Sequence, residues 1–246
     1  FLDPEIRYVT FSMADNIGAA FAAVYSAYGY DAVADTAHSA STSACGKPDC
    51  SGKECKSYQL IWGAFREYLE KNPPTKETHL LSFSGQMCRA GVFDVKDKIS
   101  IEKMGLHDLV SEQGMRFGAD PPMSLFIWAG LSAVEILRQL YIYHLPVQPH
   151  AGASRALYDE RIASLLAVIE QPLGDPANPE PEIAARADRI SAVLKEAARR
   201  YAGMEAAWQG TKSFRRVFVG GETMTKGNDF ANNGLFLRMS EQGLRL

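Results

Sequence analysis

Residues 6–13 read IRYVTFSM, a run of β-branched and aromatic residues that is typical of a buried strand. Residues 14–16 (ADN) provide a helix cap, and an Ala-rich segment with apolar residues at helical spacing follows at once. Gly29 is expected to end that helix, and residues 30–34 predict a second short strand. A strand that passes into a helix and then into another strand indicates a parallel α/β arrangement.

The same alternation continues along the chain. Residues 57–69 predict a helix that stops at Asn72-Pro73-Pro74, and residues 79–83 predict a third strand. Further helices are expected at 101–113, 122–144, 158–170, 182–201 and 230–242, with a fourth strand at 215–220. We therefore expect one α/β domain over residues 1–246. Its open parallel sheet, of the Rossmann or flavodoxin kind, is covered by helices, with a helical insertion at about 101–210 before the last strand.

The composition excludes several classes of protein. The 246 residues are 46% hydrophobic and 22% charged, unlike a disordered or fibrous chain. The net charge of −3 argues against a nucleic-acid surface. The most apolar stretch, residues 121–134, is too short to span a bilayer, so no membrane association is expected. Four cysteines and the absence of a signal peptide indicate a reducing, cytoplasmic compartment. Because Phe1 replaces an initiator Met, we expect a piece of a longer protein.

The cysteines carry the clearest chemical signal. They lie at Cys45, Cys50, Cys55 and Cys88, a C-x4-C-x4-C-x32-C pattern, and the first three fall in or just after an expected loop at 36–54 that is rich in Ser, Gly and Ala. Cys55 is expected to precede a helix, whose free N–H groups stabilise a thiolate. Cys88 follows the third strand, at the carboxyl edge of the sheet where ligands of α/β folds gather.

Three functions remain open from these residues alone. Soft thiolates select an iron–sulfur cluster or zinc, and the x4 spacings favour iron–sulfur because a zinc knuckle usually has C-x2-C. The first candidate is therefore an electron-transfer component. The second is a zinc-stabilised structural domain, and the third is a metal-free scaffold for a partner.

The cysteines also stand in recognisable boxes. Three parts of the chain follow in order: Ser51-Gly52-Lys53-Glu54-Cys55, then Gly63, then Gly85-Gln86-Met87-Cys88-Arg89-Ala90-Gly91. Together they resemble the paired signatures of the 2-hydroxyacyl-CoA dehydratase and double-cubane cluster protein superfamily. Gly220-Gly221-Glu222, Asn232-Asn233 and Glu241-Gln242-Gly243 are similar to its closing motif. The similarity is greatest to the dehydratase-like region associated with ATP-dependent acyl-CoA dehydratase activases. Lys56-Ser57 and Gln86-Met87 depart from the usual boxes.

The resemblance implies an iron–sulfur centre, either one 4Fe–4S cluster or a double cubane, that an ATP-hydrolysing activase reduces. By motif it implies Cys55 and Cys88 as ligands, and proximity adds Cys50 and Cys45. The departures leave the cluster type and the substrate open. A second copy of the chain or a related subunit is a further candidate partner. The sequence has no P-loop pattern, so ATP is not expected to bind this piece through one.

Two other residues are candidate cofactor-binding positions. Arg89, next to Cys88, has the charge to neutralise a cluster or hold an acidic substrate, and a surface ion pair is the equally weighted alternative. Glu222, after the expected last strand, is expected either to face the cleft as a site residue or to serve as a helix cap or sheet-edge residue. We also expect Cys55 and Cys88 to approach each other at the carboxyl edge of the sheet. If a metal orders the thiol-rich loop, that loop should be mobile in the metal-free protein.

Overall fold

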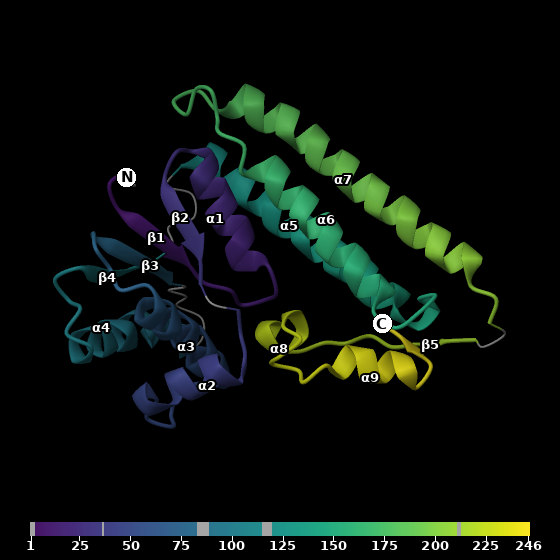
Figure 1. Ribbon diagram of the computed structural model, residues 1–246, viewed down its shortest axis with the longest axis horizontal. Coiled ribbons are helices and arrows are strands. Elements are labelled where there is room, and N and C mark those ends of the chain that lie inside the picture. The colour runs from purple at the N-terminus through teal and green to yellow at the C-terminus, as the bar shows by residue number, and fades with distance from the viewer. Residues whose placement is uncertain (1–2, 36, 83–88, 115–119, 211–212) are drawn as a thin grey trace.

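The computed structural model describes residues 3–35, 37–82, 89–114, 120–210 and 213–246. Four parallel strands form the main sheet in the order β2-β1-β3-β4 (Figure 1). Their bounds are Arg7–Thr10 for β1, Asp31–Ala34 for β2, Thr78–Ser82 for β3 and Val110–Gly114 for β4. Each parallel step needs a crossover, which helices supply here. The expected parallel α/β class is therefore confirmed.

The two faces of the sheet belong to two separate cores. Tyr8 and Leu81 pack into one apolar cluster, whereas their neighbours Val9 and Leu80 pack into the other, as the alternation of a strand requires. The first face is covered by α1 (Ile17–Ala27) and α5 (Pro121–His144), on which α6 (Ala153–Ile169) and α7 (Glu180–Ala207) pack. The second face is covered by α3 (Lys56–Lys71) and α4 (Phe93–Lys103).

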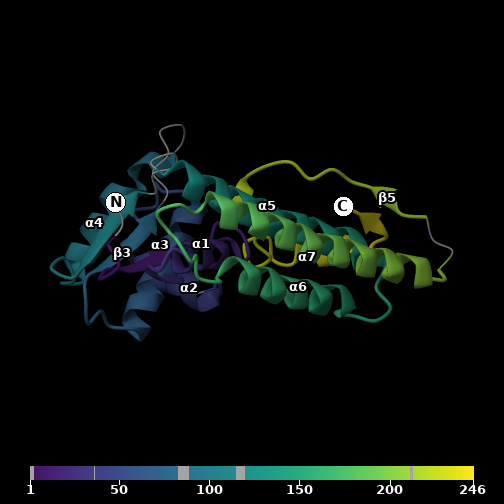
Figure 2. The same ribbon diagram turned by 90° about the horizontal axis from the view of Figure 1, so that it is seen from above.

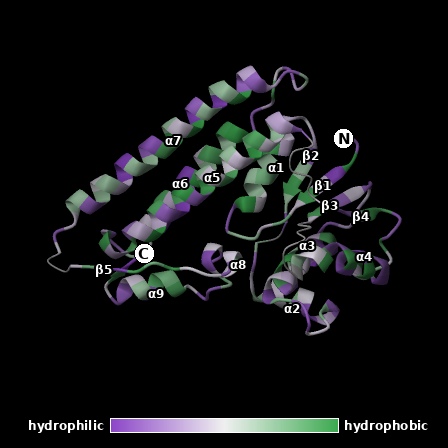
Figure 3. Ribbon diagram, turned by 180° about the vertical axis from the view of Figure 1, so that it is seen from behind, coloured by the Kyte–Doolittle hydropathy of each residue, from purple (hydrophilic) through white to green (hydrophobic). Residues whose placement is uncertain are grey.

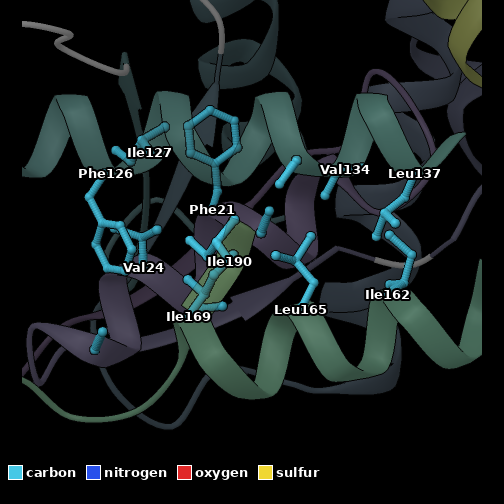
Figure 4. Packing of buried hydrophobic residues seen from close by; sticks show 14 of the residues in the cluster. Phe21, Val24, Phe126, Ile127, Val134, Leu137, Ile162, Leu165, Ile169 and Ile190 are labelled. Atoms are coloured by element: carbon cyan, nitrogen blue, oxygen red, sulfur yellow. The ribbon is translucent and has the colours of Figure 1, made fainter. Parts of the chain in front are cut away.

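The larger core joins α1 to the three long helices. Figure 4 shows Phe21 and Val24 of α1 beside Phe126 of α5 and Ile169 of α6. The helix α7 closes this layer with a mixed surface, apolar toward α5 and α6 and hydrophilic outside (Figure 3). Such one-sided patterning is what a covering helix needs, and it matches the expected solvated face of residues 182–201.

The predicted loop at 36–54 is wrong over part of its length. It contains α2 (Ala40–Gly46), followed by a short 3-10 turn, η1 (Lys47–Asp49). A capping box begins α2, because the Ser39 hydroxyl accepts from the Thr42 amide at 3.3 Å and the Thr42 hydroxyl accepts from the Ser39 amide at 2.7 Å. The small residues that suggested a loop instead allow this helix to pack closely on α3.

The predicted helix at 101–113 is also wrong. It joins the end of α4 to the strand β4, which pairs with β3 from Thr78↔Val110 to Ser82↔Gly114. Gly105 stops the helix, since its φ of +69° lies in the left-handed region that glycine adopts without strain. Pairing along β3 then decides the conformation of a segment that has little strand propensity of its own.

The expected fourth strand and its helical insertion need correction. The strand predicted at 215–220 is only β5 (Arg215–Arg216), and it pairs with β6 (Leu244–Arg245) in a separate two-stranded sheet. The long helices therefore follow the last strand of the main sheet instead of interrupting that sheet. The C-terminal segment holds α8 (Thr223–Gly227), which was not predicted, and α9 (Leu235–Glu241), a shortened form of the helix expected at 230–242.

The prediction that no segment is long enough to span a bilayer is wrong, because the apolar helix is longer than expected. The helix that starts with α5 runs from Pro121 to Val147 and is long and apolar enough by composition, because it continues well beyond Val134. Within the described residues, 44% of its most apolar window is buried inside the protein. It packs on α1, α6 and α7, as the core helix of an α/β layer does.

Candidate functional site

Three of the four cysteines lie where α2, η1 and α3 meet. Cys45 is in α2, Cys50 follows η1, and Cys55 is the N-cap residue of α3 with extended backbone. The expected position of Cys55 directly before a helix is confirmed. The turn between Cys50 and Cys55 is held by Glu54, whose carboxylate accepts from the Ser51 amide at 2.9 Å and the Ser51 hydroxyl at 2.8 Å.

Two glycines, Gly46 and Gly63, allow α2 and α3 to pack with their backbones in contact. A Cβ atom on Gly63 would lie 1.9 Å from the Thr42 carbonyl oxygen, and one on Gly46 would lie 2.0 Å from the Gln59 carbonyl oxygen. Both obstacles are backbone atoms, which cannot rotate away as a side chain can. The two helices therefore approach at backbone contact, and this approach sets the position of the loop that carries Cys50.

An aromatic and ionic contact fixes η1. The Trp62 indole nitrogen donates to the Asp49 carboxylate at 2.6 Å, and the Arg66 guanidinium donates to the same oxygen at 2.9 Å. Trp62 is fully buried in the core beneath α3. Asp49 is thereby held inward, which directs the chain from α2 toward Cys50.

Cys50 and Cys55 pack against the same apolar cluster, the one that α3 and α4 form with the sheet. The Cys50 thiol donates to the Gly46 carbonyl at 3.3 Å. Burial raises the pKa of Cys50, and the Glu54 carboxylate acts in the same direction, while the Lys96 ammonium opposes both. Lys96 is close because it forms an ion pair with Glu54 at 2.9 Å, which joins the Cys50–Cys55 turn to α4.

Cys45 lies apart from that pair. Its sulfur is 4.0 Å from a Glu70 carboxylate oxygen on the last turn of α3. Burial, and then the negative charges of Glu70 and Glu67, raise the pKa of Cys45. Carboxylates beside a thiol disfavour the thiolate that metal binding requires. Among the described thiols, the structure thus brings together Cys50 and Cys55 and leaves Cys45 on a different side of α3.

Glu222 reaches the first turn of α3 from the far end of the chain. It is the N-cap of α8 and accepts from the amides of Met224 at 3.0 Å and Thr225 at 2.8 Å. Its carboxylate also accepts from the Ser57 hydroxyl at 3.3 Å, two residues after Cys55. Burial would raise the pKa of Glu222, but the hydrogen bonds from Met224 and Thr225 lower it overall. The helix-cap alternative expected for Glu222 is therefore confirmed, and its role as a site residue stays a prediction.

The remaining site predictions fall outside what the structure describes. Cys88 lies in the undescribed segment 83–88, so its expected approach to Cys55 stays a prediction. Arg89 begins a 3-10 turn, η2 (Arg89–Val92), and its side chain is likewise outside the description. Over the described ranges, no three His, Cys, Asp or Glu side chains form a metal-binding group. A cluster site would therefore depend on Cys88.

Comparisons of the chain with protein-family models, with curated proteins and with solved structures each found no match.

A shallow groove opens beside the Cys50–Cys55 turn. It encloses about 710 Å³ between residues 52–54 and the start of α4. Val92 and Val95 line it and are 54% and 53% exposed, with Lys53 and Lys96 at its edge. An apolar surface flanked by lysines gives a partner molecule direct access to the turn that holds the thiols.

A buried carboxyl cluster beneath this site was missed by the sequence analysis. Asp97 is 1% exposed, and among the described residues neither of its carboxylate oxygens makes a hydrogen bond of full geometry, although the nearby Tyr58 and Ser82 hydroxyls act to lower its pKa. One oxygen each of Glu112 and Asp94 is also buried without a partner among the described residues. Burial raises the pKa of Asp97 to about 8, and the charges of Glu112 and Asp94 add to this effect. The sequence did contain a sign of this cluster, because Asp97 lies at helical spacing between Phe93 and Ile101, on the apolar face of α4.

We expect Asp97→Asn to stabilise the protein at pH 8. The folded state keeps a proton on Asp97 up to about pH 8, whereas the unfolded chain releases it near its ordinary pKa of 3.8. Stability should therefore fall as the pH rises from about 4 to 8, and the amide removes this loss. The gain should be about 2–4 kcal/mol at pH 8 and should vanish near pH 4, as measured by urea unfolding across that range.

The matched control is Asp108→Asn, because the Asp108 side chain is 90% exposed. This control should follow the original protein at every pH. A wild-type stability that does not change between pH 5 and 8, or a loss of stability in Asp97→Asn at pH 8, would contradict the assignment.

Proposed function

We propose that this chain is an iron–sulfur electron-transfer component similar to the subunits of 2-hydroxyacyl-CoA dehydratases. The observation that carries the proposal is the Ser57–Glu222 hydrogen bond, which joins residues 165 positions apart at the start of α3. It brings the closing motif next to the Cys55 box, and such convergence of distant motifs is expected of one shared site and not of unrelated surface turns.

The donor set of the described residues suits a soft metal centre. Cys50 and Cys55 are both partly buried against the same apolar core, which contains Tyr58 and Phe93. We propose Cys55 and Cys88 as the motif ligands and Cys50 as a third thiolate. The place of Cys45 beside Glu70 makes it the weakest ligand candidate. Bound there, a 4Fe–4S cluster or double cubane would carry single electrons at low potential.

The chain's own residues would tune and protect such a centre. Cys55 is the N-cap residue of α3, so a negatively charged centre bound there would lie at the positive end of the helix dipole. The Lys96–Glu54 pair holds the turn while keeping one cation close to Cys50. Arg89, beside Cys88, would add a second cation. Packing of the turn on the core excludes water from one side, which strengthens each of these electrostatic contributions.

The same proposal implies binding partners and a cellular compartment for the protein. An ATP-hydrolysing activase would deliver the electron, with the groove beside residues 52–54 as an accessible approach. We also propose that the sheet is of the Rossmann or flavodoxin kind and that the protein works in the cytoplasm without nucleic-acid or membrane partners. A second copy or a related subunit would complete the assembly.

One observation favours a second candidate, the metal-free scaffold. The thiol-rich segment is held by protein contacts alone, through the glycine contact of α2 with α3 and the Trp62–Asp49–Arg66 cluster. A segment ordered in this way does not need a metal to fold, so its order does not by itself favour the first candidate.

Single serine variants of the four cysteines, prepared without oxygen, test the ligand assignment. Cys55→Ser and Cys88→Ser should lose the bound iron and its redox signal, Cys50→Ser should lose part of it, and Cys45→Ser should keep most of it. The thermal stability of each variant shows whether it is folded. If Cys45→Ser loses iron while Cys55→Ser keeps it, the ligands have been assigned to the wrong residues.

A further inference from the structure

One long face of α5 is exposed to solvent, whereas its opposite side, with Phe126, Val134 and Leu137, is buried. Its exposed apolar residues are Leu125 at 66%, Trp128 at 56% and Ile136 at 43%. At 100° per residue these positions fall on one side of the helix, together with the exposed Ser132 between them. This open face of α5 is continuous over three turns and contains a single charged residue, Glu135.

A groove runs along the second half of the same face. It encloses about 720 Å³ between α5 and the strand-like segment that returns after α7. Figure 2 shows that segment passing along α5 on the side away from α6. Ile136, Leu140 and Val217 are among the apolar side chains that line the groove, and Phe218, which is 94% exposed, lies at its edge.

We propose that the open face of α5 pairs with the same face of a second copy of this chain. Two antiparallel α5 helices related by a two-fold axis at Ser132 bring Trp128 of each opposite Ile136 of the other. Leu125 of each then lies opposite Gln139, within the partner's groove. Protruding side chains on the first half of the helix thus meet a groove on its second half, which is the self-complementary pattern of a two-fold interface.

The exposed apolar area of this face agrees with a second copy of the chain as its partner. Leu125, Trp128, Ile136 and Phe218 together expose roughly 400–500 Å² of apolar surface in each chain. A stable interface buries about 800 Å² on each partner, a little over half of it apolar. These four side chains therefore provide about the apolar area of one standard interface. Ser132 at the axis is small enough to let the helices approach.

Charge favours a second copy over a lipid bilayer. Glu135, Ser132 and Gln139 are exposed on the same face, and a carboxylate in the hydrocarbon of a membrane is costly. In the antiparallel pairing Glu135 lies opposite the small Ala129, so no two like charges are brought together. The inference does not depend on the proposed cluster, because α5 covers the opposite face of the sheet from Cys50 and Cys55.

Light scattering after size-exclusion chromatography tests the pairing on the 246-residue chain. The native chain should elute at twice its single-chain mass of 27.0 kDa at micromolar concentration. Ile136→Glu should weaken self-association at least tenfold and elute as a monomer. Ile99→Glu is the matched control, because Ile99 is 42% exposed on α4 and lies off the proposed interface. It should remain dimeric.

Cross-linking locates the axis. Oxidation of Ser132→Cys should yield a covalent dimer beyond the level that the native cysteines give, whereas Gln139→Cys should not. A native chain that is monomeric at tens of micromolar, or an Ile136→Glu variant that stays dimeric, would overturn the proposal. Sedimentation of monomeric protein with phosphatidylcholine vesicles would also overturn it, in favour of a membrane surface.

Discussion

We expect Gly63→Ala to lower the free energy of unfolding by about 3 kcal/mol or more. The added methyl group would lie 1.9 Å from the Thr42 carbonyl oxygen, and only a shift of α2 away from α3 can relieve the contact. That shift would also release Thr42 and the capping box at the start of α2. Chemical unfolding measures the loss, and limited proteolysis within residues 40–55 should show where it originates.

Gly203→Ala is the matched control for this substitution. Gly203 lies in α7 with nothing within 4 Å of the position a Cβ would take. Alanine should therefore stabilise the helix by about 0.5–1 kcal/mol. Equal effects of the two substitutions, or a Gly63→Ala variant as stable as the original, would contradict the close approach of α2 and α3.

Arg138→Ala should destabilise the protein by about 3–5 kcal/mol, because it leaves two carboxylates without their main cation. The Arg138 side chain is 2% exposed and donates to Asp15 at 3.0 Å, to Asp229 at 2.8 Å and to the Lys226 carbonyl at 3.2 Å. It thereby joins α5, the loop between β1 and α1, and the C-terminal segment. Urea unfolding gives the magnitude, and faster proteolysis of residues 213–234 should accompany it.

Arg199→Ala provides the comparison for an exposed ion pair. Arg199 is 73% exposed and pairs with Glu196 on the surface of α7, so its loss should change stability by less than about 0.5 kcal/mol. If Arg138→Ala costs no more than Arg199→Ala, the C-terminal segment is not anchored through Arg138.

The first half of the fold could be predicted from the sequence because local and long-range preferences agree there. Residues 6–13 favour a strand by composition, and β1 is buried on both faces. Gly29 and the Asn72-Pro73-Pro74 stop mark helix ends that the structure reproduces closely. The cap expected within residues 14–16 falls at Asn16, but it does not act through a capping hydrogen bond. Asn16 has a φ of +66°, makes no cap bond and donates instead to the Tyr158 hydroxyl.

The errors fall where distant contacts decide the conformation. Residues 40–46 form a helix because Gly46 meets Gln59 on α3, a contact that no local pattern reveals. Val110–Gly114 forms a strand because β3 offers a partner edge, although Ser, Glu, Gln and Gly favour no strand. Likewise β5 depends on pairing with β6, 29 positions further along, so the strand expected at 215–220 is only two residues long.

The sequence allowed the candidate site residues to be named, but it did not reveal how they are arranged in space. The sequence placed Cys55 directly before a helix, which the structure confirms, and it grouped Cys50 with Cys55 by proximity alone. It also grouped Cys45 with them, whereas Cys45 faces Glu70 because α2 turns it to another side of α3. The contact of Glu222 with Ser57 depends on how α8 packs, so motif order alone could not give it.

An anaerobic preparation of the 246-residue chain, analysed by absorption spectrum and by its content of iron, acid-labile sulfide and zinc, tests the central claim most directly. The account predicts a brown protein with a broad band near ~400 nm, bleached by a strong reductant, and with iron and sulfide in comparable amounts. Folded, colourless protein that stays free of iron after reconstitution with ferrous iron and sulfide, whether it holds zinc or no metal, would contradict it.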